Sequence, residues 1–221
     1  MPKVTEEYIR NKKSKIVEAA YNLCLRKTVS AVTMQDIINE AGLSQGGIYR
    51  FYRDIDEIFA DMVRFMRQKV DLKVKVDAIL MQKEVSPGEI VEQLFAMLAV
   101  FMRNELMGIE KIDFELSVLS MNAPERTERI LKDIPDMGNM DYLNMRTSEY
   151  FMEQLRLGRI HPRVSCEELL SFISCAYVGI QMTCIVHNCY KEETDSRTPF
   201  YQPDIQLKML AQTVNYMLGE A

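Results

Sequence analysis

The fold is decided by residues 33–52, which read TMQDIINEAGLSQGGIYRFY. Two short segments, 34–41 and 45–52, flank a Gly-Leu-Ser turn, and their apolar residues return at helical spacing. Two short helices joined by a three- or four-residue turn that holds a glycine are typical of a helix-turn-helix. The segment therefore predicts this motif, with residues 45–52 as its second helix.

Capping residues mark the ends of both helices. Thr33 precedes the first helix and Asp36 lies three residues later, so the two side chains can cap each other's backbone amides. Gly42 stands where a helix commonly ends in a left-handed residue. Ser44 is a favourable N-cap for the second helix. A further capping box, Asp54 with Glu57, predicts the start of the next helix.

Helical spacing continues along the chain, and no run of alternating polar and apolar residues predicts a strand. The expected fold class is therefore all-α. A helix starting at Pro124 should be broken or kinked at Pro135 and Gly138, because proline lacks the amide donor and clashes one turn back. A loop is expected over 191–203. The remaining helices are expected over residues 6–27, 55–80, 87–108, 109–121, 140–158, 166–190 and 204–218.

Charge is unevenly distributed along the chain. Residues 1–53 contain nine Lys or Arg and five Asp or Glu, a net charge of +4, whereas the remaining residues carry 18 basic and 27 acidic side chains, a net charge of -9. The net charge of -5 over the whole chain hides this division. A basic head on an acidic body predicts that only the head meets a polyanion.

The cysteines and the hydropathy of the chain indicate in which cellular compartment the protein is expected. Five cysteines without a C-x-x-C pair favour a reduced, cytoplasmic protein, and the polar N-terminus predicts no signal peptide. Residues 169–190 lack Asp, Glu, Lys and Arg and are long enough to span a membrane, but their several polar side chains would be costly in lipid. We therefore expect no membrane association, and a helix buried on nearly all faces at the centre of a bundle or a subunit interface.

The second helix carries side chains suited to reading DNA. The amide of Gln45 can both donate to and accept from the edge of an adenine. Tyr49 can donate to a phosphate, and the guanidinium of Arg50 can bind guanine or phosphate. At the start of the first helix, Thr33 offers its hydroxyl and free backbone amides to the DNA backbone.

Two further features support DNA binding less specifically. Gly46 and Gly47 let the backbone approach another surface closely. Lys12, Lys13 and Lys15 add salt-sensitive attraction to phosphates. Spacing alone leaves an alternative open, in which Tyr49 and Tyr52 belong to the core and the lysines form a solvated face.

Residues 16–59 resemble the N-terminal domain of the TetR family of bacterial transcriptional repressors. The resemblance lies in IVEAA (16–20), TMQDI (33–37), AGLSQGGIYRFY (41–52) and DEIF (56–59). It implies a DNA-binding domain over 1–53 and a helical effector-binding and dimerisation domain over 54–221. It also implies a homodimer, joined through its last two helices, that binds a palindromic operator and is released by a ligand.

By position, the resemblance assigns DNA contacts to six residues, Thr33, Ser44, Gln45, Gly47, Tyr49 and Arg50. The family usually has a phosphate-binding Lys at the start of the fourth helix, where this chain has Ile55, so Arg50 or Arg53 would have to replace that contact. The aromatic position that usually holds phenylalanine is Tyr52 here.

The body contains most of the 16 Met, whose flexible side chains suit cavities that adapt to apolar ligands. A hydrophobic effector is therefore expected, although residues at helical spacing belong to the core first. An inward carboxylate among Glu105, Glu110, Asp113 and Glu115 would instead favour a cationic effector. The candidate effector-binding residues are Phe65, Met66, Phe101, Met102, Phe114, Met121, Tyr150, Phe151 and Tyr177.

Enzymatic motifs are not found in the sequence. His161 and His187 are its two histidines, and neither lies in a zinc-protease, nucleophile-elbow or phosphate-loop motif. We therefore expect no enzyme, metal or cofactor. Cys184 and Cys189 leave a redox-sensing role open, and a helical small-molecule-binding or protein-interaction module without DNA binding is the alternative function.

Overall fold

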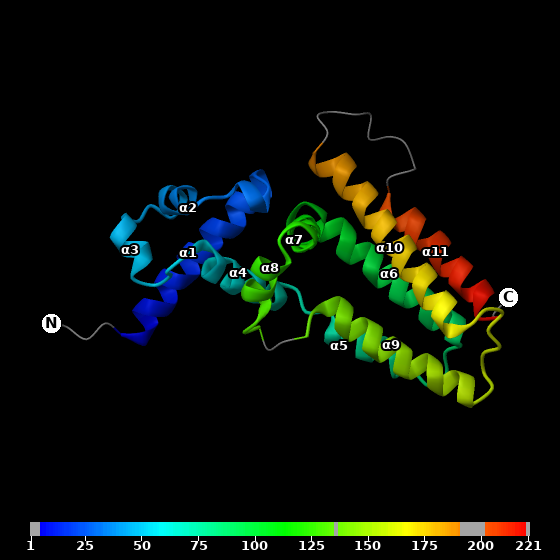
Figure 1. Ribbon diagram of the computed structural model, residues 1–221. Coiled ribbons are helices and arrows are strands. Elements are labelled where there is room, and N and C mark those ends of the chain that lie inside the picture. The colour runs from blue at the N-terminus through cyan, green and yellow to red at the C-terminus, as the bar shows by residue number, and fades with distance from the viewer. Residues whose placement is uncertain (1–4, 135–136, 191–201, 220–221) are drawn as a thin grey trace. The chain divides into compact units, whose positions relative to one another are not determined.

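The computed structural model describes residues 5–134, 137–190 and 202–219, and within them every regular element is helical (Figure 1). The predicted all-α fold class is confirmed. The chain forms two compact units. One contains Met1–Val70 and Lys111–Asp136, and the other contains Asp71–Glu110 and Met137–Ala221.

The first unit is organised around its first helix, which packs against the second and fourth helices. Its elements are α1 (Glu6–Arg26), the 3-10 turn η1 (Val29–Ala31), α2 (Met34–Ala41), α3 (Gln45–Tyr49), α4 (Ile55–Lys69), α7 (Lys111–Asn122) and α8 (Pro124–Leu131). Its fully buried apolar side chains include Ile16, Ile37, Ile48 and Phe59. Together these helices form the core that holds the helix-turn-helix.

The second unit is a bundle in which α11 packs against both α6 and α10, and α5 packs against α9 (Figure 1). Its elements are α5 (Lys73–Leu80), α6 (Pro87–Glu105), the π-helical segment η2 (Leu106–Glu110), α9 (Asn139–Arg156), α10 (Cys166–Cys189) and α11 (Pro203–Met217). Capping boxes begin α6 at Ser86 and α10 at Ser165.

The single helix predicted over residues 55–80 is wrong, because α4 ends at Lys69 and α5 begins at Lys73. Val70 is extended, and the backbone amide of Leu72 donates to the side chain of Asn139 at 3.1 Å. This partner lies far away in sequence, so the break is set by tertiary contact rather than by a local glycine or proline.

One other helix boundary also differs from the prediction. The helix expected to end at Gly108 continues through the π-helical segment to Glu110. The predicted interruption of the helix near Pro135 is confirmed, since α8 ends at Leu131 and α9 begins at Asn139. Residues 135–136 themselves lie outside the described part of the chain. The loop expected over 191–203 lies almost entirely outside it as well.

Helix α10 is not buried on nearly all faces, and that prediction is wrong for the single chain. Its buried residues are Leu169, Cys184 and Ile185, where it packs against α11 and η2. The helix is long and apolar enough to cross a membrane by length and composition. Absence of charge predicted burial, yet a large apolar face of α10 lies open, including Val178 and Met182.

The predicted domain boundary after residue 53 is a division by function, and it stays a prediction. The first compact unit extends further, because α4, α7 and α8 pack with the predicted DNA-binding head. Its last two helices come from a part of the sequence that was assigned to the effector domain. The predicted DNA-binding head, residues 1–53, is therefore packed against further helices of the first compact unit.

Candidate nucleic-acid interface

Local hydrogen bonds build the helix-turn-helix. Thr33 and Asp36 form a reciprocal capping box at the start of α2. Gly42 ends that helix with a φ of 59°, in the left-handed region that favours glycine. Ser44 Oγ accepts from the backbone amide of Gly47 at 3.2 Å and begins α3. These three predicted caps are confirmed, and they fix the turn between the two helices.

The third helix presents two different faces. Ile48 is fully buried, and Tyr52, which follows the helix, is only 2% exposed. Gln45, Tyr49 and Arg50 are exposed, Tyr49 to 46%. The core alternative is therefore correct for Tyr52 and wrong for Tyr49. The helix ends at Tyr49 rather than at the predicted residue 52.

The two glycines of α3 differ in what surrounds them. A Cβ on Gly47 would lie 3.1 Å from Ser44 Oγ, so the capping hydroxyl itself favours a small residue there. A Cβ on Gly46 would meet no atom within 4 Å. Gly46 also lies in a helix, where glycine is less favourable than alanine by about 0.5–1 kcal/mol. Packing in the head therefore does not explain Gly46, which leaves open space for another molecule to approach.

At the N-terminus of α2, the carboxylate of Asp36 is paired with a lysine. Lys27 Nζ lies 2.7 Å from Asp36 Oδ1. This contact, followed by hydrogen bonds from the backbone and hydroxyl of Thr33, lowers the pKa of Asp36 to about 2. The ionised Asp36 therefore carries a compensating cation beside Thr33, which reduces its repulsion of a phosphate approaching the free amides of α2.

The lysines of α1 do not all have the same surroundings. Lys13 Nζ lies 3.3 Å from Asp61 Oδ2, so this cation belongs to an ion pair. Lys12 Nζ lies over the ring of Tyr8, 5.5 Å from its centroid, and Lys15 is exposed. Lys12 and Lys15 therefore remain the better candidates for salt-sensitive attraction to DNA.

The start of α4 has Ile55 where a phosphate-binding lysine was expected from the resemblance, and replacement of that contact by Arg50 or Arg53 stays a prediction. Asp56, the residue after Ile55, accepts from Arg126 Nε at 2.7 Å and from Arg129 Nη2 at 3.4 Å, so α8 holds its carboxylate. Arg53 is exposed, and its Nε lies 2.9 Å from Glu57 Oε1. Arg53 thus keeps a position from which it can contact phosphate.

The predicted capping box at α4 is half right. Asp54 accepts from the backbone amide of Glu57 at 3.0 Å. The Glu57 carboxylate does not return this bond to Asp54, but accepts from the backbone amide of Arg53 at 2.9 Å. Asp54 is therefore the N-cap of α4, without a reciprocal capping box.

The candidate effector residues are divided between the two compact units, and their role stays a prediction. Met121 is 81% exposed, so it lacks the inward position for which it was proposed. Tyr150 and Phe151 pack edge to face, with ring centroids 5.1 Å apart. The first unit holds Phe65, Met66, Phe114 and Met121, and the second holds Phe101, Met102, Tyr150, Phe151 and Tyr177.

Of the four carboxylates considered for a cationic effector, two are buried. Glu110 is in the second unit and accepts from Gln181 Nε2 at 2.5 Å. Glu115 is in the first unit, where it forms an ion pair with Lys111. Glu105 is half-buried and Asp113 is exposed.

A buried ion pair that was not predicted holds the end of α1. The side chains of Lys111 and Glu115 are 4% and 8% exposed, with Lys111 Nζ 2.9 Å from Glu115 Oε1. The ammonium also donates to the carbonyls of Cys24 at 2.7 Å and Lys27 at 3.2 Å, and Glu115 Oε2 accepts from the backbone amide of Val29 at 2.5 Å. The pair therefore fixes the connection that leads from α1 into α2.

The buried thiols have environments that oppose ionisation. Burial, followed by the charge of Glu115, raises the pKa of Cys24 to about 12. Burial, followed by the charge of Glu110, raises the pKa of Cys184 to about 11. Because the thiolate is the reactive form, these values argue against redox sensing by Cys184. Within the described residues, no group of three His, Cys, Asp or Glu side chains could hold a metal ion.

Comparison with known sequences identifies the N-terminal region. The family described as bacterial regulatory proteins, tetR family, matches residues 16–62. The HTH-type transcriptional regulator YfiR of Bacillus subtilis, itself uncharacterized, is 36% identical over 62 residues, which are 28% of this chain and 30% of that protein. The match thus covers less than a third of this curated relative.

Comparison with solved structures extends the fold to nearly the whole chain. A protein described as a TetR-family transcriptional regulator from Mesorhizobium loti has a TM-score of 0.66 at 16% identity, covering 94% of this chain and 96% of that one. Thermus thermophilus FadR, a TetR-family repressor solved with lauroyl-CoA, has a TM-score of 0.53 at 17% identity, covering 91% and 92%. At these identities the likeness concerns the fold alone. Residues 16–62 therefore match the tetR family of bacterial regulatory proteins, and the helical fold of the chain is similar to that of TetR-family structures.

Proposed function

We propose that this protein is a transcriptional repressor that reads operator DNA with the exposed face of α3. One observation carries the proposal. Ile48 of α3 and Tyr52 just after it are buried in the core, while Gln45 and Tyr49 of α3 and Arg50 at its C-terminal end are exposed. A rigid helix that presents an amide, a phenol and a guanidinium to the outside suits a major groove.

Some of these groups would position the protein on DNA, and others would read the base sequence. Free backbone amides in the first turn of α2, with Lys12 and Lys15 of α1, would contact phosphates, which set orientation without reading sequence. Gln45 and Arg50 can each form paired hydrogen bonds with a base edge, to adenine and guanine respectively. The open space at Gly46 lets α3 approach the floor of the groove closely.

The proposal includes a homodimer joined through α10 and α11. Exposed apolar side chains lie along both helices, in a unit where the two helices pack together. Gly179 adds a position where a backbone can approach closely, since a Cβ there would meet no atom within 4 Å. Ile185 of α10 is fully buried within its own chain, so it is not part of this proposed interface. The exposed apolar residues are Leu170, Val178, Met182, Ile205, Met209 and Tyr216.

A small hydrophobic effector completes the proposed mechanism. FadR of Thermus thermophilus was solved with lauroyl-CoA, so acyl chains are the first class of ligand to test on this chain. An effector that favours a dimer state with a different spacing of its two heads would release the operator, because ligands shift populations between existing states. Such a regulator works in the cytoplasm, where its DNA is.

The test is a binding titration with the purified wild-type protein. A duplex enriched by the protein from a randomised library serves as operator, and a scrambled duplex of equal length serves as control. We expect a preference of about 1,000-fold or more for the operator. We also expect a steep loss of affinity with salt. Sedimentation of the complex should show two chains on each duplex.

Failure of this test has a clear meaning. Equal and weak affinity for both duplexes would favour the alternative function, a helical module that binds small molecules or proteins without reading DNA. One chain on each operator would leave DNA reading intact but contradict the dimer through α10 and α11.

A further inference from the structure

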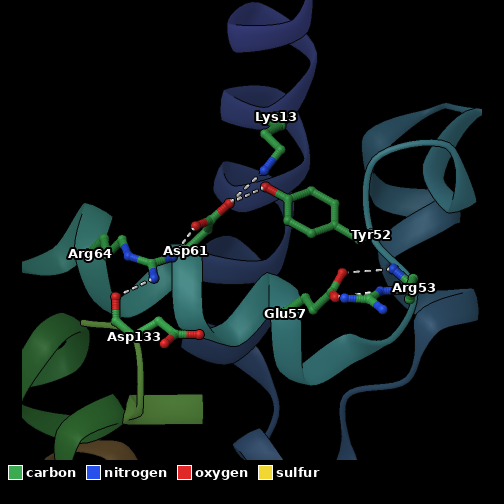
Figure 2. A network of polar contacts seen from close by, with 7 residues as sticks. All are labelled: Lys13, Tyr52, Arg53, Glu57, Asp61, Arg64 and Asp133. Atoms are coloured by element: carbon green, nitrogen blue, oxygen red, sulfur yellow. Dashed lines mark hydrogen bonds and ion pairs between the residues drawn. The ribbon is translucent and has the colours of Figure 1, made fainter. Parts of the chain in front are cut away.

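A hydroxyl group links the segment after α3 to the middle of α4. Tyr52 lies three residues after Tyr49, where α3 ends, and its OH donates to Asp61 Oδ2 at 2.8 Å (Figure 2). The Tyr52 ring is buried, and the bond itself is partly buried. A phenylalanine at this position could not make the bond.

Asp61 collects two further partners from different helices. Lys13 of α1 places its Nζ 3.3 Å from Asp61 Oδ2 and 4.8 Å from the centroid of the Tyr52 ring. Arg64, one turn further along α4, donates through Nη1 to Asp61 Oδ1 and through Nη2 to the carbonyl of Asp133 at 2.7 Å (Figure 2). One carboxylate thus ties together α1, α4 and Tyr52 in the segment between α3 and α4.

The protonation states keep this arrangement in place at neutral pH. Burial acts to raise the pKa of Asp61, but the bond from Tyr52 and the charge of Lys13 hold that pKa below its ordinary value. Burial, followed by the bond to Asp61, raises the pKa of Tyr52 above its ordinary value. Asp61 is therefore an ionised acceptor and Tyr52 a protonated donor.

We infer that Asp61 is a positioning residue for DNA reading, which holds α3 at its angle to α1 and α4 through the hydroxyl of Tyr52. This inference rests on the proposed function. Asp61 itself would not touch DNA, because it lies among Lys13, Tyr52 and Arg64. Tyr52 lies two residues after Arg50, so a small rotation about this anchor displaces the reading side chains.

The inference is tested with Asp61→Asn and with Tyr52→Phe, which keeps the buried ring and removes only the hydroxyl. Binding to the enriched operator and to the scrambled duplex is measured for each variant, at a temperature where circular dichroism shows full folding. We expect Asp61→Asn to lower the operator-to-scrambled ratio about tenfold, the effect typical of losing hydrogen bonds to a charged group. Tyr52→Phe should lower it in the same direction.

The direction of the change in DNA affinity distinguishes a positioning role of Asp61 from an effect of its charge. Asp61→Asn removes a negative charge, so electrostatics alone would strengthen binding to both duplexes. Glu40→Gln makes the same charge change at the exposed Arg26–Glu40 pair, where the two charged atoms are 2.7 Å apart, and should leave the ratio unchanged. If Asp61 acts through Tyr52, the double variant should be no worse than Asp61→Asn alone.

Several results would overturn the inference. One is an unchanged ratio in folded Asp61→Asn, and another is an equal loss on both duplexes, which partial unfolding would give. Additive losses in the double variant would show that Asp61 does not act through Tyr52. If the wild-type protein itself shows no preference for any duplex, the proposed function fails, and the inference fails with it.

Discussion

Arg50→Ala is expected to lower operator affinity by roughly 10- to 100-fold, the range expected for losing a paired contact with a base. The guanidinium lies on the exposed side of α3, opposite the buried Ile48, so its removal should not disturb the core. Tyr49→Ala should weaken binding as well, through a lost phosphate contact. Fluorescence titration with the enriched operator measures both effects.

A matched arginine gives the control for charge. Arg26 pairs with Glu40 on the surface of the same head, and Arg26→Ala removes the same charge away from α3. It should cost only the modest, sequence-independent share of affinity that a general phosphate attraction provides. If Arg26→Ala and Arg50→Ala weakened binding equally, and equally on scrambled DNA, Arg50 would not be a reading residue.

Lys111→Met is expected to reduce the free energy of unfolding by about 3–5 kcal/mol, the cost of breaking a buried ion pair from one side. The ammonium contacts the Glu115 carboxylate and the carbonyls of Cys24 and Lys27, and the carboxylate would remain buried without it. Urea denaturation followed by circular dichroism measures the change. The same substitution at exposed Lys15 should change stability by about 0.5 kcal/mol or less.

The double variant Lys111→Met with Glu115→Leu separates charge burial from packing. Replacing both partners by apolar residues often restores much of the stability lost by removing one. Recovery of at least half of the lost free energy is expected. A Lys111→Met protein as stable as the wild type would mean that the pair is not buried in solution.

The local parts of the head could be predicted from sequence because a cap is decided by a few adjacent residues. Thr33 with Asp36, Gly42, and Ser44 before α3 each depend on neighbours within four positions. Such signals survive without tertiary information.

The errors arose where distant contacts decide the structure. The break between α4 and α5 depends on Asn139, 67 residues from Leu72. The exposed face of α10 could not be inferred from the single chain, because an uncharged helix reads the same whether its own chain or a second copy covers it. Neither feature has a local sequence signal.

The two polar networks of the head also join distant segments. Val29 and Glu115 are 86 residues apart, and Lys13 and Asp61 are 48 apart. Lys111 and Glu115 did carry a partial signal, since they lie one turn apart on a helix among the buried Ile112 and Leu116. A charged pair on an apolar helix face indicates burial, but not its partners.

The expectation that the chain is not an enzyme agrees with the match of residues 16–62 to a family of regulatory proteins. Asp56, beside Ile55, accepts from Arg126 and Arg129 of α8, so the start of α4 is anchored to α8. Phosphate contact by Arg50 or Arg53 stays a prediction.

In the proposed complex, DNA lies against the exposed face formed by α2 and α3. Hydrogen–deuterium exchange of the wild-type protein, with and without the enriched operator, tests it most directly. We predict slower exchange in the operator complex for backbone amides at the start of α2 and throughout α3, relative to the complex with scrambled duplex. Slower exchange confined to other segments, with α3 unchanged, would mean that the operator does not bind at α3.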